Sequence, residues 1–363
     1  MACGMHWIPS CVTEEVFEME NKNSVGTLEE NKENLLEVHD LWVEYRTSRG
    51  AVKAVNGLNL NIAMGETLGL VGETGAGKST TAFGIMRILP DPPAKITGGE
   101  ILYKGRDLLK LSAKEMRDVR GEEISMIFQD PMTSLDPVKT VGNQIQEMIE
   151  LHTDISSKEA WTRAEDMLEV VGIKRERAND YPHQFSGGMK QRVVIAMALA
   201  CNPDLLIADE PTTALDVTIQ AQVLDMMKKL REQNGASMLM ITHDLGIVAE
   251  VCDCVSVIYA GRVVEHGTLE DVFDHTLHPY TRGLFRSLPN MEDRRSRLQP
   301  IPGLMPDPSN LGPGGAFADR CPYATERCFQ EKPAVLHRTE EHVVACHLYN
   351  PENIQKGGVW NNE

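Results

Sequence analysis

The chain has 363 residues, a formal net charge of −17 and a pI of about 5.1. This length leaves room for one large domain with an appendage, or for two domains. The acidic balance argues against a general nucleic-acid-binding protein, which would usually present a basic face, and no apolar run approaches the roughly 18 residues needed to span a membrane.

Residues 1–34 carry seven Glu and two Lys with little apolar periodicity. Such a segment is predicted to lack a packed core. It also lacks a basic region followed by an apolar stretch, so we expect no signal peptide. The eight cysteines of the chain do not form a dense disulfide framework, and a reducing cytoplasm is the expected setting.

The first strands are expected directly after this segment, with a folded domain that begins at Leu35. Residues 36–45 alternate between apolar and polar side chains as a strand does, and residues 52–62 extend this β-rich start. Tyr45 belongs to this sheet. Its ring could either pack in the core or stack on a nucleotide base.

A phosphate-binding loop follows. The sequence from Gly72 to Thr80 fits G-x-x-x-x-G-K-[ST], between a strand-like run and a run that can continue as a helix. The glycines let backbone N–H groups turn toward phosphate oxygens, and the helix N-terminus adds partial positive charge. Lys78 is expected to reach the β- and γ-phosphates, and Ser79 to bind Mg²⁺. The predicted loop contains Gly72, Glu73, Thr74, Gly75, Ala76, Gly77, Lys78, Ser79 and Thr80.

A strand at residues 124–128 ends directly before Gln129. If the sheet is parallel, this strand points toward the phosphate site, and Gln129 could touch Mg²⁺ or water; otherwise it is a polar surface residue. Residues 138–180 are predicted to be mostly helical, with helices at 141–151 and 157–171 that show apolar residues every three or four positions. These helices form an insert within the fold.

A second glycine-rich segment, Ser186-Gly187-Gly188, leads into a helix at residues 193–199. Ser186 suits the N-cap position, and the glycines leave backbone N–H groups bare at a helix start. This pattern predicts a second anion site, although an ordinary capped helix has the same sequence features.

Two further strands end in residues suited to phosphate chemistry. Residues 205–210 form a buried apolar strand that ends in Asp209 and Glu210. In P-loop NTPases an Asp at this place serves Mg²⁺, and Glu210 is placed to orient or polarise an attacking water. The alternative is an acidic pair that caps the next helix. The next buried strand is followed by His243, which is either a structural residue or a site residue at the same rim as Lys78 and Glu210.

The C-terminal part has a different composition. Residues 289–313 hold six prolines and are expected to form an extended linker. Beyond them, Cys321, Cys328 and Cys346 are spaced as C-x6-C-x17-C.

In this order the motifs resemble the nucleotide-binding subunit of an ATP-binding-cassette (ABC) transporter. The closer resemblance is to the D-type ATPase of the oligopeptide, dipeptide and nickel importers, and it spans about residues 35–349. Four stretches carry it, at residues 128–135, 185–192, 208–218 and 278–281. Met189 stands where the commoner signature has Gln, which is a D-type feature by resemblance.

The resemblance implies an α/β P-loop fold with an antiparallel β subdomain and a helical subdomain. The ABC domain would cover residues 35–288, with the helical subdomain at about 132–200. Residues 289–363 would form the linker and a small cysteine-containing extension, and residues 1–34 a disordered tail.

The family's residue roles are implied in the same way. Tyr45 would stack on adenine, and the P-loop residues would hold the phosphates and Mg²⁺. Gln129 would sense the γ-phosphate, contribute to the Mg²⁺ site and link it to the membrane subunit. The catalytic set would be Glu210 as base, His243, Gln129 and Lys78, while Asp209 would support Mg²⁺. The signature residues Ser186, Gly187 and Gly188 would close over ATP on a partner ATPase, and Asp216 is counted with the nucleotide-binding residues.

The implied function is ATP hydrolysis that powers import of di- or oligopeptides, with nickel or another small solute as the alternative. The implied partners are an F-type ATPase in a heterodimer, two transmembrane permease subunits and, indirectly, an extracytoplasmic solute-binding protein. No nucleic acid is expected, and the location would be the cytoplasmic face of the cell membrane. A soluble ABC ATPase acting on ribosomes or DNA is a remote alternative.

The cysteine-containing tail resembles a segment that holds a [4Fe–4S] cluster in relatives. Their first cysteine would fall near Gly315, where this chain has none. Cys321, Cys328 and Cys346 would then need a fourth ligand, for which His337, His342 and His347 are candidates. The alternative is a degenerate site with free thiols.

Overall fold

The computed structural model describes residues 33–48, 50–212, 215–287 and 299–350. The expectation for the acidic tail therefore lies outside the described residues, apart from its last two positions. The described residues between 33 and 350 belong to one compact unit. The C-terminal extension is part of this unit.

The N-terminal half of the unit contains a four-stranded antiparallel sheet in the order β2-β1-β4-β5. Its first strand is long, and its buried residues switch from even-numbered to odd-numbered positions part-way along it. Leu36 and Val38 are buried before a register shift, and Leu41 and Val43 after it, with Asp40 at a φ of 48° between them. The bulge keeps both halves of the strand facing the core. The strands are β1 (Asn34–Thr47), β2 (Gly50–Ala63), β4 (Ala94–Tyr103) and β5 (Arg106–Asp107).

The second sheet has eight strands in the order β11-β12-β10-β9-β3-β8-β7-β6. Strands β9, β3, β8, β7 and β6 run parallel, and four of them are buried along their whole length, as expected for strands covered on both faces. The strands are β3 (Thr67–Val71), β6 (Ile124–Ile127), β7 (Leu205–Asp209), β8 (Ser237–Thr242), β9 (Cys254–Tyr259), β10 (Arg262–Thr268), β11 (Leu336–His337) and β12 (Val343–Val344).

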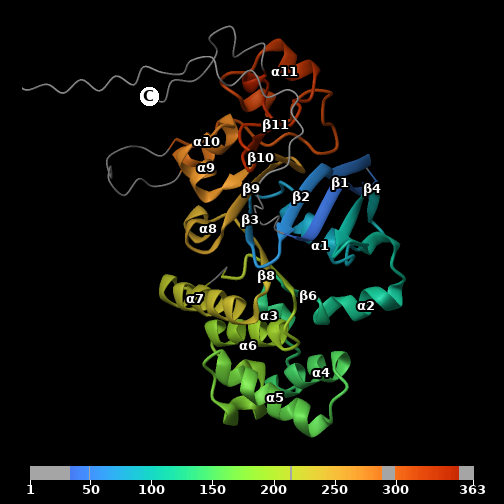
Figure 1. Cartoon of the computed structure of the whole chain (residues 1–363), viewed down its shortest axis with the longest axis vertical. Coiled ribbons are helices and arrows are strands. Elements are labelled where there is room, and N and C mark those ends of the chain that lie inside the picture. The colour runs from blue at the N-terminus through green and yellow to red at the C-terminus, as the bar shows by residue number, and fades with distance from the viewer. Residues whose placement is uncertain (1–32, 49, 213–214, 288–298, 351–363) are drawn as a thin grey trace, which may run out of the picture. The chain divides into compact units, whose positions relative to one another are not determined.

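The predicted helical insert is present. Helices α4 and α5 pack against each other and against α6 (Figure 1). The helices are α1 (Lys78–Ile85), α2 (Ala113–Glu122), α3 (Pro131–Ser134), α4 (Val141–His152), α5 (Ser157–Val170), α6 (Gly187–Leu199), α7 (Val217–Asn234), α8 (Leu245–Val251), α9 (Leu269–Asp274), α10 (Pro279–Arg286) and α11 (Glu326–Gln330).

The start of α5 agrees with the expected one at Ser157, whereas the start of α6 differs from the expected one. The N-cap of α5 is Ser156, which forms a capping box with Glu159, so the helix begins at Ser157 with its cap one residue earlier. Helix α6 begins at Gly187 rather than at Val193. Ser186 occupies its N-cap position but makes no side-chain cap hydrogen bond.

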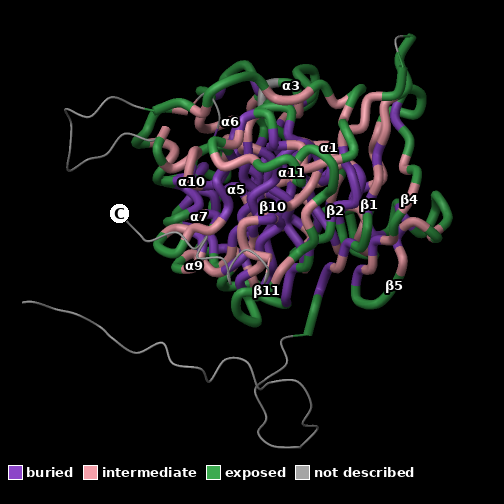
Figure 2. The backbone as a smooth tube through the Cα atoms, turned by 90° about the horizontal axis from the view of Figure 1, so that it is seen from above, coloured by how far each residue is buried: buried purple, intermediate pink, exposed green. Residues whose placement is uncertain are grey.

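The core consists of two clusters of buried apolar residues. One lies between the antiparallel sheet and α1, and the other between the helical subdomain and the parallel strands. Figure 2 shows the buried positions concentrated in the central strands, with exposed positions along the outer loops.

The C-terminal extension joins the second sheet through β12. Val343 and Val344 pair antiparallel with His266 and Glu265 of β10. Glu265 is fully buried, and its carboxylate accepts hydrogen bonds from the backbone of residues 277 and 278 and lies 3.0 Å from Nε2 of His342. A buried carboxylate with these partners fastens the extension to β10.

Candidate active site

The loop between β3 and α1 has two positions where only glycine fits. A Cβ on Gly72 would lie 2.3 Å from the carbonyl oxygen of Ile258, and a Cβ on Gly77 would lie 2.5 Å from that of Ala54. Gly77 also has a φ of 106°, which L side chains rarely adopt. The loop is therefore packed closely on β9 and β2 before it enters α1.

Lys78 is the first residue of α1 and is 6% exposed. Its Nζ donates to the carbonyl oxygens of Gly72 at 2.7 Å and of Glu73 at 3.1 Å. Burial lowers the pKa of this ammonium, against the opposing effect of nearby carboxylates such as Glu210. A cation is thus held inside the concave side of the loop.

A cleft of about 280 Å³ opens beside the loop. It brings together residues from the loop and from the ends of three parallel strands, as expected when carboxyl ends of strands meet at one edge of a sheet. The cleft is lined by Ala54, Thr74, Gly75, Gly77, Lys78, Ser79, Thr80, Gln129, Glu210 and His243.

Asp209, at the end of β7, lies beside Ser79. The Ser79 hydroxyl donates to Asp209 Oδ1 at 3.1 Å, and Asp209 is 1% exposed. Burial raises the pKa of the Asp209 carboxyl, and the hydrogen bond from Ser79 partly offsets this effect. A hydroxyl and a carboxylate are the kinds of oxygen ligand that Mg²⁺ takes in nucleotide sites, where phosphates and water complete its shell. The donor set therefore fits Mg²⁺.

Glu210 has a backbone φ of 47°, and its N–H donates to the carbonyl oxygen of Ile241 at 2.8 Å. Its carboxylate accepts a hydrogen bond from Gln129 Nε2 at 2.8 Å, and its other oxygen lies 3.0 Å from His243 Nδ1. A left-handed backbone in a non-glycine residue is uncommon and is concentrated at functional sites. Two side chains from separate strands thus aim one carboxylate into the cleft.

Several predicted site residues lie elsewhere. Tyr45 is half-buried on β1 and packs against the cluster under the antiparallel sheet. Ser186 and Gly187 are exposed at the start of α6. The Asp216 carboxylate caps α7 by accepting a hydrogen bond from the N–H of Ile219 at 3.0 Å.

The sequence reading missed two contacts to the loop. The Arg320 side chain binds the Glu73 carboxylate, and the Tyr280 hydroxyl accepts a hydrogen bond from the Glu73 N–H at 2.9 Å. Neither residue belongs to a pattern that contains Glu73, because more than 200 positions separate them. No local signal could have found these contacts.

Comparison with known proteins shows the family to which the chain belongs. A family model described as "ABC transporter" matches residues 55–213, and one described as "Oligopeptide/dipeptide transporter, C-terminal region" matches residues 264–328. The chain is 52% identical over 321 residues to the oligopeptide transport ATP-binding protein OppD of Bacillus subtilis, covering 88% of this chain and 90% of that protein. The chain belongs to the ABC transporter ATP-binding proteins.

Other relatives agree with this family. The dipeptide transport ATP-binding protein DppD of Bacillus subtilis is 50% identical, with coverage of 87% and 95%. Among solved structures, the dimeric ATP-binding cassette MJ0796 in a post-hydrolysis state with ADP and Pi is similar with a TM-score of 0.59 and 29% identity, covering 64% of this chain and 98% of that one.

This ABC ATPase therefore has the α/β cassette fold with β and helical subdomains that the motifs predicted, and that prediction is confirmed. Hydrolysis of ATP is its activity. Within the described residues, no helix has both the length and the apolar character required for a membrane span.

Proposed function

We propose that this ATPase powers the import of di- or oligopeptides through a multisubunit ABC transporter. The observation that carries the proposal is the match of residues 264–328 to the oligopeptide/dipeptide transporter C-terminal region, together with about 50% identity to proteins named for oligopeptide and dipeptide transport. Nickel or another small solute is the second candidate cargo.

In the proposed mechanism two ATPase subunits face each other head to tail. The exposed Ser186 and Gly187 lie outside the cleft, so a second subunit has to supply a signature helix to each bound ATP. ATP then favours the closed pair through its contacts with both subunits, and hydrolysis releases them. The dimeric structure of the MJ0796 cassette supports this arrangement.

Inside the cleft, Lys78 and the loop N–H groups bind the phosphates, while Ser79, Asp209 and Gln129 serve Mg²⁺. Glu210 accepts a proton from the attacking water as the water oxygen bonds to the γ-phosphorus. The bond from that phosphorus to the bridging oxygen breaks, which leaves ADP and phosphate. His243 stabilises the γ-phosphate.

The remaining roles involve contacts outside the described cleft. Tyr45 stacks on adenine, Gln129 also couples the site to the permease, and Asp216 contributes to nucleotide binding. The partners are an F-type ATPase in a heterodimer, two transmembrane permeases and, indirectly, an extracytoplasmic binding protein. The complex places this subunit at the cytoplasmic face of the cell membrane.

Uptake of labelled solutes tests the cargo. Cells that carry Glu210→Gln in place of the native chain are expected to lose uptake of labelled di- or oligopeptides and to keep uptake of nickel. The reason is that the substitution removes the proposed base without altering the permeases. If peptide uptake is unchanged and nickel uptake is lost, the transported solute is nickel and not a peptide, while the ATPase mechanism still holds.

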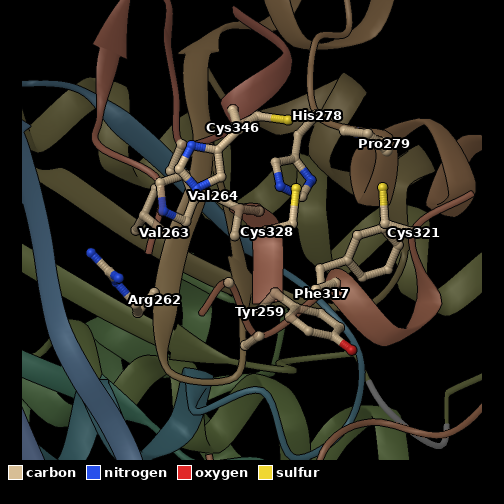
Figure 3. Close-up of a pocket in the computed structure, with 16 residues that line it drawn as sticks. Tyr259, Arg262, Val263, Val264, His278, Pro279, Phe317, Cys321, Cys328 and Cys346 are labelled. Atoms are coloured by element: carbon tan, nitrogen blue, oxygen red, sulfur yellow. The ribbon is translucent and has the colours of Figure 1, made fainter. Parts of the chain in front are cut away.

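The iron–sulfur cluster that the resemblance implied depends on whether the three C-terminal cysteines can bind it together. Cys321, Cys328 and Cys346 come from separate segments around one largely apolar cavity, which Gly315 also lines (Figure 3). Among the residues that the structure describes, no group of three or more His, Cys, Asp or Glu is arranged to hold a metal ion. Burial raises the pKa of the Cys321 thiol, and that of Cys346 to about 12, which disfavours the thiolates that a cluster needs. The side chains as placed do not fit a cluster.

The three histidine candidates are also separated. His337 is exposed on β11, His342 is bound to Glu265, and only His347 lines the cavity with the thiols. Iron and sulfide analysis of the anaerobically purified chain tests whether the three cysteines hold an iron–sulfur cluster. About four iron atoms per chain would establish a [4Fe–4S] cluster, and an iron-free chain with titratable thiols would establish free cysteines.

A further inference from the structure

The C-terminal extension contacts the phosphate-binding loop through one ion pair. Arg320 ends a short 3₁₀ turn, Ala318–Arg320, in the extension. Its Nη1 donates to Glu73 Oε2 at 2.7 Å, and its Nη2 donates to Glu73 Oε1 at 3.0 Å. Two parallel hydrogen bonds between a planar guanidinium and a carboxylate fix orientation as well as distance.

Arg320 is itself held in place. Its side chain is 6% exposed, its Nε donates to the carbonyl oxygen of Pro302 at 2.9 Å, and its Nη1 lies 3.2 Å from the Tyr259 hydroxyl, to which it donates. The hydrogen bonds to Glu73 raise the pKa of the guanidinium further above its usual range. These contacts hold the Arg320 guanidinium in one position, unlike a mobile charge on the surface.

Glu73 is held at its backbone as well. Its N–H donates to the hydroxyl of Tyr280, which is fully buried on α10. The Tyr280 ring packs at 4.6 Å from Tyr259 and 5.4 Å from Phe317, measured between ring centroids. Figure 3 shows Tyr259 and Phe317 side by side at the edge of the cysteine-lined cavity.

The same residue also touches the lysine of the loop. The carbonyl oxygen of Glu73 accepts a hydrogen bond from Lys78 Nζ. A continuous path thus runs from Arg320 through Glu73 to Lys78. Glu73 lies directly after Gly72 in a loop rich in glycine, and a glycine-rich loop loses much conformational entropy when it is ordered around a ligand. Any contact that orders this loop beforehand strengthens ligand binding.

We propose that Arg320 is a positioning residue for nucleotide binding: the C-terminal extension clamps Glu73 and thereby holds the phosphate-binding loop in its binding form. The clamp also pairs the Glu73 carboxylate with a cation, so that this charge does not repel the phosphates. The inference rests on ATP binding at this loop and is independent of the transported cargo.

Titration calorimetry of the purified full-length chain with ATP, in the absence of Mg²⁺ to prevent turnover, tests the proposal. Arg320→Met keeps the apolar stem and removes the guanidinium, and it is expected to raise the Kd for ATP about tenfold, which corresponds to about 1.4 kcal/mol. Arg320→Lys, which keeps the charge but not the fork, is expected to recover part of this loss.

Arg327→Met is the matched control. Arg327 lies in the same extension and pairs with Glu331 at 3.0 Å on the surface, with both side chains exposed. Its removal is expected to change the Kd less than twofold, because exposed ion pairs contribute little. In steady-state assays with Mg²⁺, the Arg320→Met variant should show a rise in KM for ATP that exceeds any fall in kcat.

A double-mutant cycle separates positioning from simple stabilisation. Glu73→Gln combined with Arg320→Met should bind ATP no more weakly than the weaker of the two single variants, since both remove one interaction. If the losses of ATP affinity in the two single variants add up in the double variant, the proposed clamp is wrong. It is also wrong if Arg320→Met has an unchanged Kd for ATP and only a lower Tm. If Arg320→Met fails to fold, Arg320→Lys and Glu73→Gln provide the same comparison, and unchanged Kd values in both would overturn the proposal.

Discussion

Glu210→Gln is expected to lower the rate of ATP turnover by two to four orders of magnitude, of the order that a positioned general base contributes, and to leave the Kd for ATP nearly unchanged. The carboxylate is held from both sides, by Gln129 at 2.8 Å and by His243 at 3.0 Å. An amide of the same shape keeps the space filled but cannot accept the proton of the attacking water. Phosphoryl transfer depends largely on positioning and charge, so this single atom change affects the chemical step and not binding.

Phosphate release measured at saturating ATP, together with calorimetric binding, checks this result. Glu331→Gln is a matched control, because Glu331 is an exposed residue directly after α11 whose carboxylate forms a surface ion pair with Arg327. Its turnover should equal that of the native chain. Near-normal turnover in Glu210→Gln would remove Glu210 from the catalytic role.

Lys78→Ala is expected to raise the Kd for ATP at least about thirtyfold, since truncating one partner of a buried charged contact costs about 2–5 kcal/mol. The buried ammonium lines the cleft, and it also donates hydrogen bonds to the carbonyl oxygens of Gly72 and Glu73. The substitution removes the charge that meets the phosphates and leaves both carbonyl groups without that donor.

Calorimetry with ATP measures this loss, and a thermal melt without nucleotide shows whether the chain is still folded. Lys229→Ala provides the control, because Lys229 lies on α7 in an exposed pair with Asp225 at 2.7 Å. Its Kd should match that of the native chain. Unchanged ATP binding in a folded Lys78→Ala chain would contradict the assigned role.

Features that depend on neighbouring residues alone were predictable from the amino-acid sequence. The loop from Gly72 to Thr80 carries its own geometry, because glycine placement, the preceding strand and the following helix are all encoded within a few residues. The strand ends at Gln129, Asp209 and Glu210 were predictable for a related reason. Buried apolar runs of strand length indicate a parallel sheet, and the ends of such strands meet at one edge.

Contacts between residues far apart in the chain could not be predicted and became visible in the folded structure. Three such contacts are the hydrogen bonds to the Glu210 carboxylate, the pairing of β12 with β10 and the Arg320–Glu73 ion pair. They join residues that lie 33 to 247 positions apart in the sequence. Such contacts depend on how whole elements pack, and neither hydrophobic periodicity nor motif spacing carries that information.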